Sequence, residues 1–524
     1  MGNGSGSEGD LIELSVEMLE DLGRDEVKEL AKQLLTTLKA MHASNEELKQ
    51  LLSQRDAELA DLRRVVFGHK SERTVSVDRQ VRARKKKTAE GKAAALAQAR
   101  QRRRENAQAK QTNLESEDIH HSVQAELLCC PICGGTKFED LGKGEISDEY
   151  EYVPARLMRK RHIRQKMVCC GCHQHIVTAE CPVRVADKVL YGPGFHAHVA
   201  VSKCSDSIPL TRQAKQLRRS EVVICRSTLC DIFQRDAALL RSLYRRMLEL
   251  IALSQYVNAD ETPVPVLDKE KKKTRKAYMW TFIIEQIVAY VYSPSRSGQT
   301  PLAVLGESQG YLQADDYSGY NQVTKPDRRI RIGCWGHLRR YFWKSMDDSP
   351  EESKHLLDEV VLLYEVEYEA LEQGVLGTEV HLAMRKEKSA PVVARIKQWL
   401  DTQQPRQAPK SKLGKAIGYA LSNWTEMTRF LADPKIKLDN NISERQLRLI
   451  ALGRKNFLFV GNDEAGESLA ILQSLTSSCE LNGVDPQQYL TDVLIRIQTH
   501  PQSQIDELLP HNWQPPARSP PPST

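Results

Sequence analysis

The first regular pattern of apolar positions along the chain falls between residues 34 and 66, where they recur at alternating steps of four and three. This spacing predicts a coiled coil, because it places an apolar seam along one side of a helix. Asn45 in the seam favours a dimer of fixed register, whereas Arg55 disfavours it. One long amphipathic helix that packs on its own protein is the alternative. The seam positions are Leu34, Leu38, Met41, Asn45, Leu48, Leu52, Arg55, Leu59, Leu62 and Val66.

Beyond residue 200 the pattern changes twice more. Residues 200–250 have helical periodicity, and the stretch RQAKQLRRSEVVICRSTLCDIFQRDAALL predicts two helices around a turn, with Ser227 as the N-cap of the second. A helix-turn-helix and a plain helical hairpin fit this pattern equally well. Short β-branched and aromatic runs between residues 255 and 345 predict a sheet, and residues 350–432 return to a helical pattern that continues towards residue 498.

Composition and charge indicate a compartment and a class of partner. The chain has 524 residues, of which 40% are hydrophobic, and this length predicts several domains. It has no run of about 18 apolar residues, and the start MGNGSGSEGD lacks the features of a signal peptide, so we expect a cytosolic protein. The net charge is +6, but residues 82–104 are almost free of acid. That block is either a solvated tether or a segment that neutralises nucleic-acid phosphates.

Together these patterns divide the chain into segments. We expect a disordered start (1–25), a coiled coil (26–75), a basic linker (76–125), a zinc-binding module (126–185), a helical segment that is a candidate DNA-binding unit (186–252), a core (253–480) with a helical insertion at about 347–432, a C-terminal helical region (481–513) and a disordered Pro-rich tail (514–524).

Four of the twelve cysteines form two C-x-x-C pairs. In a cytosolic chain such clustering points to a metal rather than to disulfides. Each short turn places two sulfurs on one side of an ion, so two pairs can complete a tetrahedral, structural zinc site. Buried free thiols are the alternative. The expected ligands are Cys130 and Cys133, in CPICGG, and Cys169 and Cys172, in CCGC; Cys129, Cys170, His173, His175 and Cys181 are neighbouring candidates.

Three acidic stretches are candidates for catalytic chemistry. Asp260 follows the run QYVNA, and Asp315 and Asp316 follow the strand-like run YLQA. Strand ends hold acids either because turns favour Asp or because metal sites need rigid supports. Glu444, in KLDNNISERQLRLIALGRKN, is either a metal ligand or, if Asn441 is the N-cap, the N3 residue of a capping box. Spacing alone does not distinguish a catalytic carboxylate from a helix cap.

Several long motifs occur together in one order: DETPV, LQADDYSGY, CWGHLRRYF, DNNISERQLRLIALGRKNFLFVGND, ELNGVDPQQYL and DELLPHNW. With RRVVFGHKSER, the CPICGG knuckle and the IPLTRQ segment, the chain resembles the large transposase subunit of the insertion sequence 66 family over nearly its whole length. It departs from the family at Asp316, where a glycine is usual, and around Ser220 and Glu221, where a glycine is expected between two helices.

The resemblance implies a multidomain α+β protein: a coiled coil, a zinc-ribbon-like module, a helical DNA-binding segment, a ribonuclease-H-like α/β DDE core with an all-helical insertion, and a C-terminal helical region. Its catalytic triad would be Asp260, Asp315 and Glu444, holding Mg²⁺ or Mn²⁺ in addition to a structural Zn²⁺ elsewhere. The implied reaction frees a 3′-hydroxyl at the transposon end and joins it to target DNA. DNA contacts are expected at His337, Arg339, Arg340, Arg445, Arg448, Arg454 and Lys455, although the first three also fit a helix with a solvated basic face.

The implied partners are the terminal inverted repeats, target DNA, another copy of the chain through the coiled coil, and small accessory proteins of the element. Two other functions fit the same residues. One is a non-catalytic DNA-binding regulator derived from a transposase, against which the three intact acids argue. The other is a two-metal nuclease, such as a junction resolvase, which hydrolyses DNA without joining it. Strand transfer by the purified protein distinguishes a transposase from both.

Overall fold

The computed structural model describes residue 101 and residues 157–168, 170, 176–180, 183–186, 189–268 and 270–515. All of them belong to the compact unit Val77–Thr524. The predicted coiled coil at 26–75 lies outside the described residues, and so do the predicted zinc ligands Cys130, Cys133, Cys169 and Cys172. The described part consists of the predicted core with its flanking helices, and an antiparallel hairpin of β1 (Lys166–Val168) and β2 (Ile176–Thr178).

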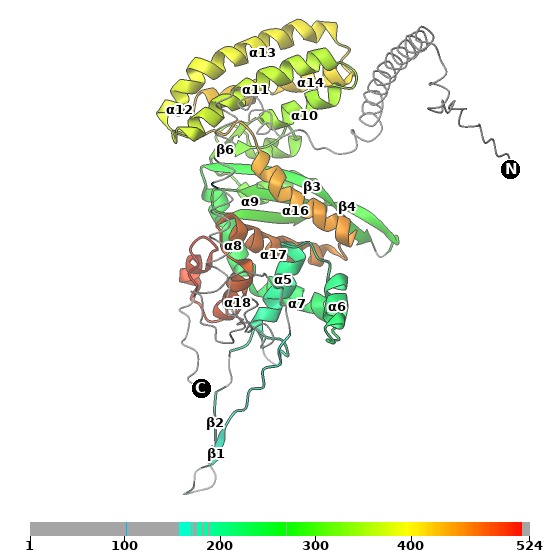
Figure 1. Ribbon diagram of the computed structural model, residues 1–524, viewed down its shortest axis with the longest axis vertical. Coiled ribbons are helices and arrows are strands. Elements are labelled where there is room, and N and C mark those ends of the chain that lie inside the picture. Colours follow the sequence, from blue (N-terminus) through cyan, green and yellow to red (C-terminus); the bar gives the residue numbers. More distant parts are fainter. Residues whose placement is uncertain are drawn as a thin grey trace, which may run out of the picture. The chain divides into compact units, whose positions relative to one another are not determined.

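Within the described residues, a mixed sheet of five strands forms in the region where the sequence predicts strands (Figure 1). β3, β4 and β5 are antiparallel neighbours, and β6 and β7 continue the sheet in parallel on the other side of β3. The order is β5-β4-β3-β6-β7, so β3 is the central strand. The bounds are β3 (Tyr256–Asp268), β4 (Lys273–Ile283), β5 (Val288–Ser293), β6 (Gly310–Gln313) and β7 (Arg329–Ile332).

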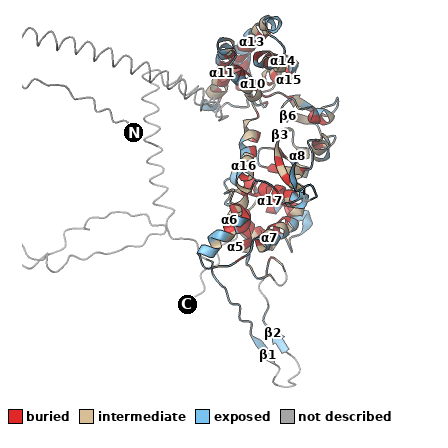
Figure 2. Ribbon diagram, turned by 90° about the vertical axis from the view of Figure 1, so that its right-hand side faces the viewer, coloured by how far each residue is buried: buried red, intermediate tan, exposed pale blue. Residues whose placement is uncertain are grey.

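Helix α17 (Asp463–Leu481) covers the edge of the sheet that β5 forms. An edge strand has backbone N–H groups that need partners when they are buried. The N–H groups of Val288 and Tyr290 donate to the hydroxyl oxygens of Ser478 (2.9 Å) and Ser474 (2.8 Å) on α17. This pairing explains the buried serines of a helix that is buried along most of its length (Figure 2).

One hydrophobic core joins the sheet to the helices that precede and follow it. Trp280 and Phe282 of β4 are completely buried in this core, as are Leu229 and Met247 of the preceding helices. The elements that share it are α5 (Pro193–Cys204), α6 (Leu210–Arg219), α7 (Arg226–Leu239), α8 (Arg241–Leu253), α9 (Gln299–Leu305), α16 (Asn441–Phe457), α17, α18 (Pro486–Arg496) and the 3₁₀ turns Ser318–Val323 and Gln502–Leu508.

Helices α6 and α7 are the two helices that the sequence predicts around a turn. The predicted N-cap Ser227 is wrong: α7 begins at Arg226, Cys225 is its N-cap, and Ser227 lies in the first turn. There its hydroxyl contacts the Cys225 thiol (2.9 Å) instead of capping the helix. In the turn, Glu221 has a φ of 61°, in the left-handed region that favours glycine. A glutamate therefore adopts the conformation for which a glycine was expected.

A second hydrophobic core belongs to the helical insertion. α10 contributes Trp335, Leu338 and Phe342 to it, so α10 packs with the insertion, although it precedes the predicted start at about residue 347. The elements of the insertion are α10 (Trp335–Ser345), α11 (Pro350–Glu372), α12 (Glu379–Met384), the π-helical turn Arg385–Ser389, α13 (Ala390–Gln403), α14 (Lys412–Ser422), α15 (Trp424–Thr428) and the 3₁₀ turns Gln404–Arg406 and Arg429–Leu431.

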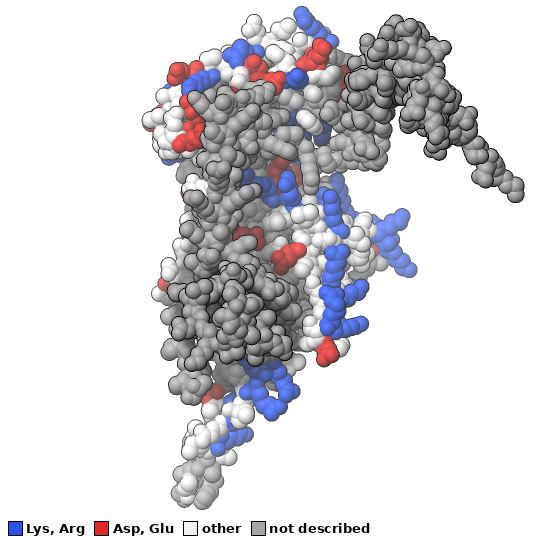
Figure 3. All heavy atoms as spheres, in the orientation of Figure 1, with Lys and Arg blue, Asp and Glu red and all other residues white. Residues whose placement is uncertain are grey.

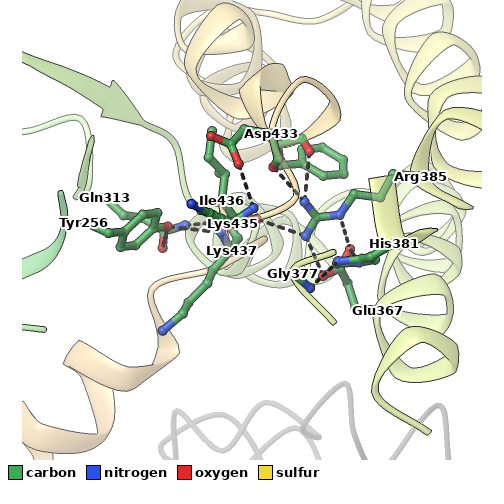
Figure 4. A network of polar contacts seen from close by, with 11 residues as sticks. Tyr256, Gln313, Glu367, Gly377, His381, Arg385, Asp433, Lys435, Ile436 and Lys437 are labelled. Atoms are coloured by element: carbon green, nitrogen blue, oxygen red, sulfur yellow. Dashed lines mark hydrogen bonds and ion pairs between the residues drawn. The ribbon is translucent and has the colours of Figure 1, made fainter. Parts of the chain in front are cut away.

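A buried arginine attaches the insertion to the segment that leads back to the sheet (Figure 4). Arg385 is 1% exposed, and its guanidinium donates to the carbonyls of Asp433 (3.2 Å) and Ile436 (2.9 Å). Glu367 of α11 pairs with the same guanidinium at 2.7 Å. A buried charge is tolerated because it has both a counter-ion and carbonyl acceptors. The returning segment, residues 433–437, is thereby held from the insertion side.

The sheet holds the other side of the returning segment. The Lys437 N–H donates to the Tyr256 hydroxyl (3.1 Å), and the Lys437 carbonyl accepts from the Gln313 amide (2.9 Å). The Tyr256 hydroxyl donates in turn to the side-chain oxygen of Gln313 (2.8 Å). β3, β6 and the returning segment are therefore linked shortly before α16 begins (Figure 4).

Three buried amide side chains, Asn258, Gln313 and Asn440, continue this network to the start of α16, and we call them the amide cluster. The Asn258 amide donates to the side-chain oxygens of Gln313 (3.0 Å) and Asn440 (2.9 Å). The Asn440 amide donates to the carbonyl of Ala259 (2.8 Å). All three side chains are buried, so each bond replaces one that water would otherwise make. The cluster fixes β3, β6 and α16 relative to one another.

We expect Asn440→Ala to lower the free energy of unfolding by about 1–3 kcal/mol, because it removes the partners of the buried Asn258 amide and the Ala259 carbonyl. Denaturant titration of the full chain measures this difference. Asn321→Ala is the matched control, since Asn321 is exposed and its side chain accepts one hydrogen bond, from Arg331 (3.1 Å). Equal stabilities of the two variants would contradict the role given to the amide cluster.

Candidate active site

Two candidate acids lie at the same level along the parallel pair β3–β6. Asn258 and Gln313 are directly opposite each other in this pair. Asp260 lies two residues after Asn258, and Asp315 lies two residues after Gln313, just beyond the end of β6. Since alternate residues of extended chain share a face, both acids lie close to the amide cluster.

The third acid reaches the same region from α16. Asn440, whose side chain is bonded to β3, immediately precedes this helix, and Glu444 lies one turn later. The Glu444 side chain is 26% exposed and forms an ion pair with Arg340 of α10. Its Oε1 atom also lies 3.8 Å from Nε2 of His337. Glu444 is therefore positioned between the sheet and the insertion.

The alternative in which Asn441 caps this helix is wrong. Asn441 is the first residue of the helix, and its amide contacts the Asp439 carboxylate. Glu444 therefore falls one residue beyond the capping-box position, and its carboxylate pairs with Arg340. The helix begins one residue earlier than that cap would allow, because Asn440 takes the N-cap position while its side chain bonds to β3.

Asp315 and Glu444 lie close enough to Asp260 to affect its pKa. Burial raises the pKa of Asp260 to about 8, and the charges of Glu261, Asp315 and Glu444 raise it as well. Within the described residues, no three His, Cys, Asp or Glu side chains already stand as a set of metal ligands. The donors themselves are hard carboxylate oxygens, which suit Mg²⁺ or Mn²⁺, and a divalent cation offsets the repulsion that raises this pKa.

The two adjacent acids after β6 have different surroundings. Asp315 is 24% exposed, accepts the Tyr317 N–H (3.0 Å), and lies 4.0 Å from the Arg296 guanidinium. Asp316 is exposed and lines a cavity of the insertion beside Tyr419. Asp315 therefore lies with Asp260, and this geometry favours Asp315 as the second acid.

Sequence reasoning missed a further acid in this region. Glu261 follows Asp260 directly, and its side chain is 1% exposed. It accepts a hydrogen bond from the Tyr320 hydroxyl (2.8 Å) and pairs with Arg296, whose guanidinium also stacks 3.8 Å above the centre of the Tyr317 ring. Burial raises the pKa of Glu261. The motifs DETPV and YSGY contain the acid and both tyrosines, but their contacts depend on the fold.

His337 lies beside the acids, and its side chain is 11% exposed. Burial lowers its pKa, the Arg340 charge lowers it further, and Glu444 and Asp315 act in the opposite direction. Within the described residues its Nδ1 atom has no hydrogen-bond partner. A neutral imidazole with a free ring nitrogen is able to exchange a proton with a group held at the carboxylates.

The predicted basic residues do not all face solvent. Arg445, Arg448 and Lys455 are exposed on α16. Arg454 donates to the Pro263 carbonyl (2.6 Å), which ties the end of α16 to β3. Arg339 is 5% exposed, so its guanidinium is not available at the surface. Figure 3 shows further Lys and Arg side chains gathered over α6 and the turn between β3 and β4.

Comparison with known proteins identifies the class. The family model described as "Transposase IS66 family" matches residues 188–468, and the "IS66 C-terminal element" matches residues 474–511. These two matches define the chain as a transposase of an insertion sequence. The chain belongs to the IS66 family of transposases, as its motifs led us to expect.

Relatives in Sinorhizobium fredii (strain NBRC 101917 / NGR234) are similar in sequence to this chain over most of its length. "Uncharacterized protein y4jD" is 34% identical over 413 residues, which are 75% of this chain and 79% of the relative. "Uncharacterized protein y4qI" is 31% identical over 404 residues, covering 74% of each chain, and "Uncharacterized protein y4hP" is 28% identical over 408 residues, covering 74% of this chain and 73% of the relative. The likeness therefore extends well beyond one motif.

The N-terminal region has its own match. The model described as "zinc-finger binding domain of transposase IS66" matches residues 128–173, and this range contains all four predicted zinc ligands. The comparison supports zinc binding there. Among the helices described by the structure, none combines the length and the apolar character that a membrane span requires.

We expect Asp260→Asn to raise the melting temperature by several degrees at pH 8 without added Mg²⁺ or Mn²⁺, because it removes a buried charge that neighbouring acids oppose. The pKa of Asp260 is raised from 3.8 to about 8, so the folded chain binds the proton more tightly than the unfolded chain does. This term therefore destabilises wild type progressively as the pH rises through that range. Thermal unfolding from pH 5 to pH 9 measures the effect.

Asp260→Asn should lose the part of the pH dependence of the melting temperature that titration of Asp260 causes. The remaining pH dependence should be the same as in wild type. A variant that melts below wild type at pH 8 without metal would show that the ionised carboxylate stabilises the fold, contrary to this electrostatic description.

Proposed function

We propose that the protein is a DDE transposase that cuts the ends of its element to free a 3′-hydroxyl and joins that hydroxyl to target DNA. The observation that carries the proposal is the convergence of Asp260, Asp315 and Glu444 from three separate parts of the chain. The mixed sheet, and an insertion that ends before Glu444, also support the ribonuclease-H-like core that the resemblance implies.

In this proposal the three carboxylates hold Mg²⁺ or Mn²⁺. Two such ions, when bound, activate an attacking oxygen and stabilise the leaving oxygen of an in-line displacement at phosphorus. The amide cluster keeps Asp260, Asp315 and Glu444 in place without relying on the metal. Tyr317 and Arg296 orient Asp315 through the contacts described above. Arg340 pairs with Glu444 until a bound cation neutralises the charge of the Glu444 carboxylate.

The basic side chains then have separate roles. Arg445, Arg448 and Lys455 are exposed on the helix that carries Glu444, so they are proposed to contact the phosphates of the cut strand. Arg340 and His337 lie nearer the acids and are proposed to contact the reacting phosphate or the leaving group. Arg454 and Arg339 are not assigned to DNA, because one is bonded to β3 and the other is buried.

We expect Glu444→Gln to abolish Mg²⁺-dependent nicking at the 3′ end of the element's terminal repeat. The nicking rate should fall by more than about 100-fold, because removing a residue that only orients a metal ligand lowers activity by up to about that factor. Purified protein and labelled DNA with that repeat measure nicking and strand transfer on one gel. Glu307→Gln is the control, since its side chain is 86% exposed.

The products distinguish the alternatives. Nicked and joined products from wild type support a transposase, whereas nicked products without joining indicate a nuclease. Binding of the repeat without any product favours the DNA-binding regulator. Cutting by Glu444→Gln at the wild-type rate would exclude Glu444 from the catalytic group.

We expect one zinc ion per chain, lost in the double variant Cys130→Ser/Cys133→Ser, because two thiolates cannot complete a tetrahedral site. Metal analysis of the purified protein by mass spectrometry measures the zinc content. Cys225→Ser is the control, as Cys225 lies on the exposed surface near α7. Full zinc content in the double variant would place the site elsewhere.

A further inference from the structure

A cavity in the insertion adjoins the candidate active site. It has a volume of ≈ 460 Å³ and lies between α10 and α14, with the residues before α14 completing its wall. Two of its residues are chain neighbours of the site: Asp316 follows Asp315, and Tyr341 follows Arg340, which pairs with Glu444. A DNA strand bound at the acids therefore has its next nucleotide within reach of this cavity.

Stacked aromatic rings form one wall of the cavity. The ring centres of Tyr341 and Tyr419 are 4.5 Å apart, with 22° between the ring planes. Tyr341 is nevertheless 41% exposed, so part of its ring is open to solvent. An exposed ring that is already supported from behind offers a rigid face on which another planar ring can stack.

Gly418 of α14 lines the cavity. It is exposed, and a Cβ atom added there would have no heavy atom within 4 Å. At Gly414, one turn earlier, the same atom would meet the Ala408 carbonyl oxygen at 2.1 Å, so packing requires that glycine. Packing does not require Gly418, so a longer side chain at this position would project into the space of the cavity.

The other walls carry groups that match the edge of a nucleobase. Gln404 and Gln407 have amides that both donate and accept, and Asp316 is an acceptor for an exocyclic amino group. Lys415 supplies a positive charge for the accompanying phosphate. Flat aromatic surface, amides and a lysine together suit a nucleotide better than an apolar ligand.

We propose that this cavity binds one unpaired base, carrying an exocyclic amino group, of the DNA strand whose phosphates lie at the acids. The inference rests on the proposed function, because it takes the DNA at the acids as given. Drawing a base out of the stack costs free energy, and stacking on Tyr341 recovers part of it. Asp316, which lines the cavity, then contributes to the choice of base.

Two DNA probes test the proposal on the full-length protein. One is a hairpin duplex with a single-stranded tail of five cytidines, and the other has the same tail without bases. Their phosphates are identical, so a difference in affinity reports the bases alone. Fluorescence anisotropy in a buffer without added Mg²⁺ or Mn²⁺ measures binding while preventing cutting.

Wild type should bind the cytidine tail about fivefold to a hundredfold more tightly than the abasic tail, the range expected for stacking one base on an aromatic ring. Gly418→Met, which fills the cavity, should reduce this ratio to near one. Gly418→Ala leaves most of the space and should retain the preference. Tyr341→Leu should reduce it, because the ring face is lost. Circular dichroism and thermal unfolding verify that each variant is folded.

Equal binding of the two tails by wild type would overturn the proposal, and so would a preference that survives in Gly418→Met. The outcome of this binding test can be distinguished from the outcome of the cutting test of the proposed function. A wild type that cuts transposon ends but shows no base preference contradicts the cavity proposal alone. A base preference that Gly418→Met removes, in a protein that never cuts its ends, contradicts the transposase mechanism alone.

Discussion

The hydrogen bonds among Asn258, Gln313 and Asn440 determine the geometry of the candidate site. They join the central strand, its parallel neighbour and the start of α16, and each of these segments carries one of the three acids within a few residues. Burying Asp260 beside other carboxylates is unfavourable by itself, as its raised pKa indicates. The buried amides supply bonds that do not depend on those charges, so the acids are held together before any cation binds.

The site also depends on the insertion, although the insertion has its own hydrophobic core. α10 packs in that core and presents His337, Arg340 and Tyr341 towards the acids and the adjoining cavity. A movement of the insertion against the sheet would separate Arg340 from Glu444. The buried Arg385, bonded to the returning segment, opposes such a movement because its guanidinium would lose the carbonyl acceptors of Asp433 and Ile436 (Figure 4).

Much of this architecture was predictable from the sequence, because it follows from local pattern. β-branched runs marked the strands, and helical periodicity marked the insertion. The long motifs identified the family, which the comparisons confirm. The coiled coil, the individual zinc ligands and the catalytic roles of the acids remain predictions. The convergence of the acids was expected from the resemblance and not from their spacing, which fitted turns and caps equally well.

The amide cluster was beyond sequence reasoning. Asn258 and Gln313 are 55 positions apart, and Asn258 and Asn440 are 182 positions apart, so their bonds depend on tertiary structure. The start of α16 was misjudged for the same reason: local capping rules do not register that Asn440 is bonded to a distant strand. Ser227 shows the converse, since a good capping residue was displaced by the neighbouring Cys225. Polar residues with distant partners are therefore where local rules were least reliable.

The most direct test of the central claim is an anomalous difference map from crystals of the protein with Mn²⁺ and terminal-repeat DNA. We expect an anomalous peak bonded to carboxylate oxygens of Asp260, Asp315 and Glu444, at distances near the ≈ 2.1 Å typical of small divalent cations, with Arg340 displaced from Glu444. A peak that lacks Glu444 as a ligand, with the Arg340 pair intact, would contradict it.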